Sequence, residues 1–366
     1  MPQRPDTDDY AFLLRHDVPM IDLRAPIEFD KGAFPTAVNL PLMTDAERAQ
    51  VGTCYKRKGQ EAAIELGHRL VSGAIREARM AAWLDFARRH PEGYLYCFRG
   101  GLRSRTVQNW LREAGVHYPR VLGGYKALRR FCIDDFEARV QRQSFWVVAG
   151  PTGSGKTRVI QACRHALDLE GLARHKGSSF GRTFEPQPPQ IGFENALAIE
   201  LMKLGDNGPH PILVEDESRL IGRCALPLNL RDKMAASPVI RVEEPFESRV
   251  ELILEEYVLQ PLTWLTSRNA DAHVAWEALS ERLLSSLDRI RKRLGGARHQ
   301  TLRALMEDAL TAHRERNDLD GHRAWITGLL QDYYDPMYRW QMENKPRDVV
   351  FQGSRDAIAA WLAERT

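Results

Sequence analysis

The chain has 366 residues, of which 43% are hydrophobic and 28% charged, and its formal net charge at pH 7 is +3. This length exceeds what one small core needs and predicts two domains, while the composition excludes a disordered or fibrous protein. The small net charge says little about a nucleic-acid partner, because that inference depends on local clusters of basic residues.

The five cysteines are odd in number and include no Cys-x-x-Cys pair. Neither a disulfide framework nor a zinc site is therefore expected, and we expect no haem. No apolar run approaches the roughly 18 residues that a membrane span needs, and the opening residues lack the apolar core of a signal peptide. We therefore expect a cytoplasmic protein without a membrane partner.

The first predicted elements are short strands. Residues 18–24 (VPMIDLR) form an apolar run, and the turn-rich segment 32–42 (GAFPTAVNLPL) follows, which indicates strand, loop and strand. Residues 94–98 (YLYCF) predict another strand. Beyond it, a helix is indicated by the spacing of Val107, Trp110, Leu111 and Ala114.

Cys97 lies at the junction between this last strand and the helix. Backbone N–H groups and the helix dipole at such a junction favour a thiolate and hold an attached anion. The alternative is an inert buried strand cysteine, but the neighbouring glycines and arginines favour function. The predicted catalytic residues are Cys97, Arg99 and Arg103, and the predicted anion cradle is Gly100, Gly101 and Ser104.

A second loop carries the Walker A pattern. Residues 145–150 (FWVVAG) predict a strand that enters GPTGSGKT at 150–157, and a helical pattern follows, which is the context that this motif requires. In such a loop the glycines let the backbone wrap phosphates, the lysine reaches their terminal oxygens and the hydroxyl binds Mg²⁺. The predicted ligands of the phosphates are Gly150, Gly153, Ser154, Gly155, Lys156 and Thr157.

Downstream, the strand pattern PILVEDES at 211–218 ends in three acids, of which Asp216 is the predicted Mg²⁺-associated acid beside Thr157. The alternative is an ordinary strand end with exposed carboxylates. Further strand patterns at 166–173, 238–244 and 347–353 complete a small parallel sheet. The sequence thus predicts an α/β protein with domains at 1–143 and 144–366, the second carrying a mainly helical insertion at about 246–345.

The predicted insertion contains a basic run and an aromatic segment. The basic residues are Arg289, Arg291, Lys292, Arg293 and Arg298, and the aromatic segment is QDYYDPMYRWQ at 331–341. Basic charge beside stacking surfaces fits RNA binding. A solvated helix face is the alternative.

Several segments resemble known families. Residues 21–42 and 121–130 (VLGGYKALRR) resemble the opening and closing segments of a rhodanese domain, with the Cys97 loop between them. That loop places five residues between Cys97 and Arg103, one more than the common sulfurtransferase loop has, and this spacing also resembles the cradle of cysteine-dependent phosphatases. Four further segments resemble tRNA selenouridine synthases: 51–73, 171–181 (GLARHKGSSFG), 214–222 (VEDESRLIG) and 333–338 (YYDPMY).

The resemblance implies an N-terminal rhodanese-like domain fused to a P-loop domain. It implies conversion of the wobble 2-thiouridine of tRNA to 2-selenouridine through an S-geranylated intermediate, with geranyl diphosphate and selenophosphate as co-substrates and a selenophosphate-supplying enzyme as a further partner. Cys97 would then carry selenium. Two alternatives stay open: a P-loop kinase or NTPase with a non-catalytic rhodanese module, and a cysteine-dependent phosphatase, although Tyr96 stands where an adjacent His would be expected.

Overall fold

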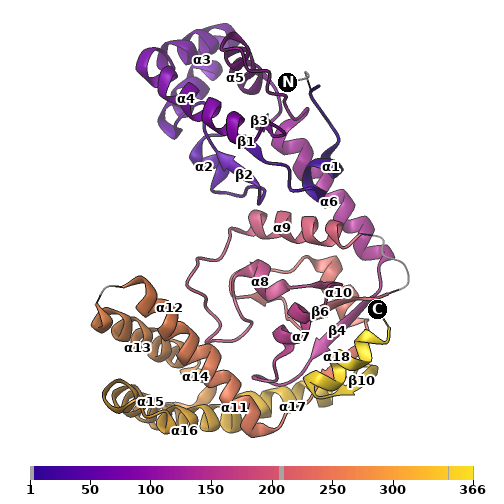
Figure 1. Ribbon diagram of the computed structural model, residues 1–366, viewed down its shortest axis with the longest axis vertical. Helices are drawn as coiled ribbons and strands as arrows, with labels where there is room; N and C mark the ends of the chain where they lie inside the picture. Colours follow the sequence, from indigo (N-terminus) through magenta and orange to yellow (C-terminus); the bar gives the residue numbers. More distant parts are fainter. Residues whose placement is uncertain (1–3, 206–209, 270, 345, 366) are drawn as a thin grey trace. The chain divides into compact units, whose positions relative to one another are not determined.

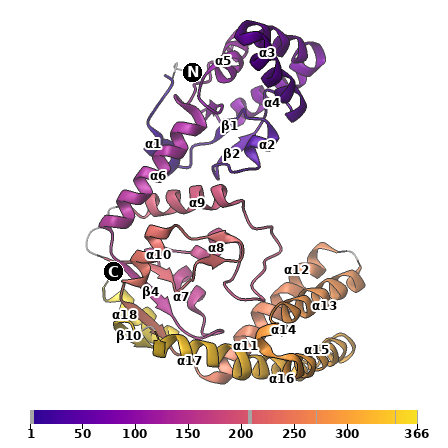
Figure 2. The same cartoon turned by 180° about the vertical axis from the view of Figure 1, so that it is seen from behind.

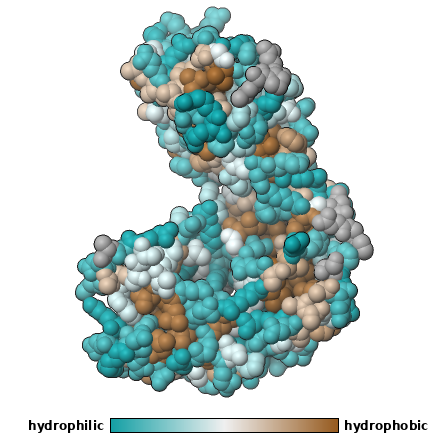
Figure 3. Space-filling view, viewed as in Figure 1, coloured by the Kyte–Doolittle hydropathy of each residue, from teal (hydrophilic) through white to brown (hydrophobic). Residues whose placement is uncertain are grey.

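The computed structural model describes residues 4–205, 210–269, 271–344 and 346–365. The chain divides into two compact units, drawn in Figure 1: the first unit comprises residues 1–139 and 188–205, and the second comprises 140–187 and 206–366. Within the described ranges, no helix is both long and apolar enough to span a membrane. The face of each unit seen in Figure 3 is mostly hydrophilic, with separate hydrophobic patches.

The first unit is built on a three-stranded parallel sheet of order β2-β1-β3. Its strands are β1 (Met20–Asp22), β2 (Ala37–Asn39) and β3 (Tyr94–Tyr96). Its helices are α1 (Tyr10–Arg15), α2 (Pro26–Phe29), α3 (Asp45–Leu70), α4 (Gly73–Arg89), α5 (Leu102–Glu113), α6 (Gly124–Arg142, crossing the boundary after residue 139) and α9 (Gln190–Lys203). Ile21 of β1 lies opposite Val38 and Leu95.

Helix α5 follows the predicted spacing up to Leu111, whereas Ala114, the last residue of the predicted stripe, is exposed and lies one residue beyond the end of the helix. Val107, Trp110 and Leu111 are buried and pack in one cluster with Leu95 of β3 and Trp83 of α4. Because residues three and four apart share one face of a helix, this stripe seats α5 against the sheet. The helix therefore begins directly behind the Cys97 loop.

Helix α9 belongs to the first unit although it lies between two strands of the second along the sequence. Arg129 donates a hydrogen bond to Asn195 (2.8 Å), whose own amide donates to the Ala33 carbonyl (3.0 Å). Lys203 pairs with Asp17 at 2.9 Å. Residues 188–205 thus supply part of the packing of the first unit.

The second unit contains a five-stranded parallel sheet of order β10-β9-β4-β6-β5. The strands are β4 (Phe145–Ala149), β5 (Ala166–Leu167), β6 (Ile212–Glu215), β9 (Val239–Val242) and β10 (Val349–Gly353), beside a hairpin of β7 (Leu220–Ile221) and β8 (Cys224–Ala225). Helices α7 (Lys156–Ala162), α8 (Leu169–Ala173), α10 (Leu228–Ala235) and α18 (Arg355–Ala363) accompany the sheet. The expected parallel sheet is confirmed.

The strand expected over 166–173 is shorter than predicted. It ends at Leu167, because Asp168 caps helix α8 by accepting a hydrogen bond from the Gly171 amide at 2.6 Å. A capping aspartate satisfies an amide that would otherwise lack a partner at the start of a helix, so the second half of this segment is helical.

Helices follow one another from residue 246 to 344. They are α11 (Phe246–Leu254), the π-helical turn η1 (Glu255–Leu259), α12 (Gln260–Arg268), α13 (Ala272–Arg289), α14 (Arg291–Leu294), α15 (Gly296–Arg316), α16 (Asp320–Leu329), the π-helical turn η2 (Leu330–Tyr334) and α17 (Asp335–Asn344). Figures 1 and 2 both show α15 and α16 side by side. Residue 345, the predicted end of the insertion, lies outside the described residues.

Candidate functional site

The glycine loop after β4 has the backbone conformation that its sequence predicts. Gly153 and Gly155 have φ values of +79° and +80°, which side chains with a Cβ rarely adopt. A Cβ at Gly153 would lie 2.9 Å from the Arg249 carbonyl oxygen, and one at Gly155 would lie 2.7 Å from Cδ of Arg355. Both glycines are therefore required by conformation and by space.

Two polar side chains converge on this loop. The Lys156 ammonium donates a hydrogen bond to the Gly150 carbonyl at 2.8 Å, which holds the amine over the loop. The Ser154 hydroxyl is buried, and its oxygen has no hydrogen-bond partner among the described residues. Because a buried polar group without a partner is costly, Ser154 is suited to an anion bound in the loop.

Carboxylates lie at the start of helix α7. Thr157 donates a hydrogen bond from its hydroxyl to Glu170 at 2.8 Å. Burial and the negative charge of Glu170 raise the pKa of Glu217 to about 8, against the opposing charge of Lys156. Burial, followed by the charges of Asp168 and Glu170, also raises the pKa of Glu215 well above its ordinary value.

The predicted acid Asp216 has a different partner. Its carboxylate accepts a hydrogen bond from Arg347 at 2.7 Å. The acids shown to interact with the Walker residues are two that the sequence did not single out: Glu170, which accepts a hydrogen bond from Thr157, and Glu217, whose pKa is affected by the charge of Lys156. Successive side chains in an extended chain point to opposite sides. Glu215 and Glu217 are therefore expected on one side and Asp216 on the other, and this alternation was a signal that Asp216 and Glu217 have different surroundings.

Among the described residues, no group of three His, Cys, Asp or Glu side chains is arranged to hold a metal ion. Mg²⁺ is usually bound by one or two carboxylates together with substrate phosphates and waters. The Thr157 hydroxyl with Glu170 beside it fits that partial set of ligands. A magnesium ion would therefore depend on a bound phosphate group for its remaining ligands.

The second candidate site is the loop that follows β3. Cys97 is only 3% exposed, and its Sγ lies 3.4 Å from the Ser104 hydroxyl. The Cys97 carbonyl accepts a hydrogen bond from the Tyr125 amide at 3.0 Å. A Cβ at Gly124, where φ is +60°, would lie 2.2 Å from that carbonyl oxygen. The segment 121–130 thus packs directly against the Cys97 loop.

The two predicted arginines of this loop differ in their surroundings. Arg103 donates a 2.7 Å hydrogen bond to Glu28. Burial opposes the ionised form of Glu28, but the hydrogen bond and charge of Arg103, together with the Ala25 amide and the charge of Arg48, lower the pKa of Glu28. Arg99 is exposed, and Gly100 and Gly101 are half-buried. The structure therefore brings Ser104 to the sulfur, whereas Arg103 is paired with a carboxylate.

The predicted RNA-binding residues fall into two groups. The exposed residues Arg291, Lys292, Arg293 and Arg298 form what we call the basic cluster, on α14 and the start of α15. Arg289 instead donates hydrogen bonds to the Ser179 carbonyl and the Ser286 hydroxyl, both at 2.6 Å.

The aromatic surface expected over 331–341 is largely internal. Tyr333 and Tyr334 are 8% and 3% exposed, whereas Trp340 is 59% exposed. The two tyrosines belong to the hydrophobic core of the helical region, because that region has to bury its own apolar faces. The expectation that they offer a stacking surface is therefore wrong, and the exposed ring of this segment is that of Trp340.

A parallel sheet whose central strand enters a glycine loop closed by Lys156 and followed by a helix defines a P-loop protein. The family model described as the tRNA 2-selenouridine synthase AAA domain matches residues 143–366. Relatives named tRNA 2-selenouridine synthase include proteins of Marinobacter nauticus (52% identical, 100% of both chains), Azotobacter vinelandii (54%, 99% of this chain and 98% of the relative) and Cupriavidus pinatubonensis (53%, 99% of each). The chain belongs to the tRNA 2-selenouridine synthase family, which confirms the family that its sequence predicts.

Proposed function

We propose that this chain replaces the sulfur of wobble 2-thiouridine in tRNA by selenium, through an S-geranylated intermediate. The co-substrates are geranyl diphosphate and selenophosphate, the latter delivered by a selenophosphate-supplying enzyme. The observation that carries the proposal is the match over the whole chain to proteins named for the 2-selenouridine product. The P-loop and the Cys97 loop support it as sites for two successive anionic substrates.

In the first step, the thiouridine sulfur attacks the geranyl carbon that is bonded to the diphosphate. The C–S bond forms, the C–O bond breaks with its electron pair passing to the diphosphate, and the base loses its ring N–H proton. Lys156 and the loop amides face the charge that develops on the leaving group, and preorganised charge of this kind is usually a large catalytic contribution. Mg²⁺ beside Thr157 would supply further charge neutralisation there.

In the second step, the Cys97 thiolate attacks C2 of the geranylated base and displaces geranylthiol, and the selenium of selenophosphate then displaces Cys97 from C2. Water cleaves the P–Se bond, so phosphate leaves and 2-selenouridine remains. We assign this step to a rhodanese-like domain within residues 1–143, with the P-loop domain at 144–366. A parallel sheet that delivers Cys97 at the end of β3, closed by the segment 121–130, supports the assignment. Cys97 is the proposed nucleophile, and Arg99 and Arg103 are the proposed partners of the selenophosphate anion.

We assign tRNA binding to the basic cluster, which is exposed in the helical region. Lysine and arginine side chains neutralise backbone phosphates, and this contribution dominates affinity for nucleic acids. Trp340 offers an exposed ring for base stacking. We expect the protein to act on tRNA in the cytoplasm.

Two variants test the order of the steps. Lys156→Ala should slow geranylation by orders of magnitude, so neither modified nucleoside should form. Cys97→Ala should still geranylate thiolated tRNA and should accumulate that product without selenium. Cys54→Ala, which changes a half-buried cysteine of α3, is the matched control and should support both steps.

The assay is nucleoside mass spectrometry of digested tRNA after incubation with geranyl diphosphate and selenophosphate. Efficient selenation by Cys97→Ala, or loss of geranylation in that variant alone, would show that the two sites are wrongly assigned. Hydrolysis of ATP in stoichiometric proportion to product would instead support the kinase or NTPase alternative.

A further inference from the structure

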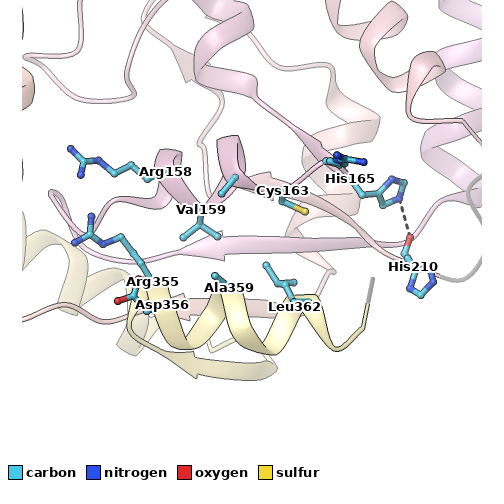
Figure 4. A pocket seen from close by; sticks show the side chains of 12 residues that line it. Arg158, Val159, Cys163, His165, His210, Arg355, Asp356, Ala359 and Leu362 are labelled. Atoms are coloured by element: carbon cyan, nitrogen blue, oxygen red, sulfur yellow. Dashed lines mark hydrogen bonds between the residues drawn. The ribbon is translucent and has the colours of Figure 1, made fainter.

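A groove of about 810 Å³ runs between helices α7 and α18 of the second unit. Figure 4 shows its lining residues, with α18 along one wall and the end of α7 along the other. The middle of the groove is apolar and lined by small or aliphatic side chains: Val159, Ala162 and Cys163 on one wall, and Ala359, Leu362 and Ala363 on the other. This volume is in the usual range for small-molecule sites, about 300–1,000 Å³.

One end of the groove adjoins the phosphate loop. Arg158 and Arg355 lie there together, at the end of the view in Figure 4 opposite the histidines. A Cβ at Gly155 would lie 2.7 Å from Cδ of Arg355 and 3.3 Å from one of its terminal nitrogens. The guanidinium of Arg355 is held by Glu244 at 3.0 Å and that of Arg158 by Glu255 at 2.7 Å. Each of the two cations thereby has a carboxylate partner beside the loop.

The other end of the groove is polar. His165 lies 3.2 Å from the His210 carbonyl oxygen through its Nε2, and burial lowers the pKa of His165, so its ring is neutral at pH 7. Ala363 follows Arg355 by eight positions in α18, which at 1.5 Å per residue corresponds to about 12 Å of groove. The groove thus has a mouth with two arginines and Asp356, an apolar middle, and a polar end with His165, His210 and Arg164.

We propose that this groove holds the geranyl chain of geranyl diphosphate while the P-loop holds the diphosphate; the inference rests on the proposed function and adds the place of the hydrocarbon. An apolar chain gains free energy in proportion to the apolar surface it buries, and the groove offers that surface directly behind the loop. Among the described residues that line it, none is Phe, Tyr or Trp, which disfavours a stacked nucleotide base.

The placement also orients the reaction. With the chain in the groove and the diphosphate in the loop, the geranyl carbon bonded to oxygen lies at the mouth, beside Arg158 and Arg355. The thiouridine sulfur reaches that carbon from the open side, and the two guanidinium groups, each paired with a glutamate, lie beside the diphosphate as the C–O bond breaks. Reacting atoms held in one orientation contribute substantially to rate.

The test fills the groove without touching the phosphate loop. Ala359→Trp places a bulky ring between the walls, and Ala360→Trp is the matched control one residue along the same helix, outside the lining residues. Both alanines are exposed, so neither change overpacks the core. Ala162→Phe narrows the groove from α7 and serves as the second variant.

Binding of geranyl diphosphate and of inorganic diphosphate is measured by calorimetry for the wild type and the three variants. The wild type should prefer geranyl diphosphate by a factor on the order of 100. Ala359→Trp and Ala162→Phe should lose most of this preference and keep their affinity for inorganic diphosphate. Ala360→Trp should behave as the wild type does.

Three results would overturn the inference. A preference retained in both groove variants would place the chain elsewhere and leave the proposed function standing. A wild type without any preference for geranyl diphosphate would defeat the proposed function and the inference with it. Tight binding of ADP that only the groove variants lose would identify the groove as a nucleotide base site.

Discussion

Loss of one partner of the buried ion pair of Asp22 and Arg24 should strongly destabilise the first unit. Their side chains are 0% and 2% exposed and lie 2.7 Å apart. The Arg24 guanidinium also donates to the carbonyls of Glu28 (3.0 Å) and Gly32 (2.9 Å) and stacks 3.6 Å above the Tyr125 ring. Arg24 therefore ties β1 to the turn after α2, and Asp22 is the carboxylate that neutralises it.

Asp22→Asn keeps the shape of this side chain and removes its charge, so the guanidinium stays buried without a counter-charge. Breaking one partner of a buried pair costs about 3–5 kcal/mol. The matched control is Asp134→Asn, which breaks the pair of Arg130 with Asp134 on α6, where the side chains are 73% and 52% exposed. An exposed pair contributes under about 1 kcal/mol.

Native-state hydrogen exchange of the β1 and β3 amides measures the effect where it should occur. Because about 1.4 kcal/mol corresponds to a factor of ten, exchange through unfolding should quicken by about 100-fold or more in Asp22→Asn. In Asp134→Asn it should change by less than about tenfold. Equal rates in the two variants would refute the reasoning, since burial would then not decide the contribution of the pair.

The second unit gives three further predictions. The raised pKa of Glu217 means that the folded state keeps a proton that the unfolded chain releases. The free energy of unfolding should therefore fall as the pH rises from about 4.5 to about 8. Thermal melts of Glu217→Gln should not show this loss. Burial and the charge of His313 lower the pKa of His322 to about 4. The free energy of unfolding should therefore fall as the pH drops from about 6.5 to about 4, and thermal melts of His322→Gln should show a smaller fall. Replacing Arg291, Lys292 and Arg293 of the basic cluster by Ala should weaken tRNA binding and flatten its dependence on salt, by about one unit of slope for each backbone phosphate that is no longer neutralised; unchanged titrations would return the cluster to a solvated helix face.

Local patterns in the sequence predict local structure well in this protein. The spacing of Val107, Trp110 and Leu111 suffices to place α5, because which face of a helix is buried depends on the helix period alone. The Walker A loop is likewise contained in eight consecutive residues. Asp168 is also a local signal, for a helix cap. The alternation of apolar residues around it predicts a strand, but in the structure Asp168 caps helix α8 and the strand ends before it.

Contacts between distant segments could not be predicted in the same way. Glu170 reaches Thr157 from helix α8, and Glu28 reaches Arg103 across 75 positions of sequence. These pairs depend on how the strands and helices pack, which the period of a single segment does not contain. The missed acids near the P-loop and the pairing of Arg103 have this common cause.

The chain passes from one unit to the other three times, after residues 139, 187 and 205. Helix α9 is encoded in the middle of the P-loop half, yet its Asn195 is held by Arg129 of the other half. A recombination event that exchanged only the N-terminal half for that of a relative would leave α9 against a foreign surface. We therefore expect a chimera to fold only when the partner of the Arg129–Asn195 contact is exchanged together with its half of the chain.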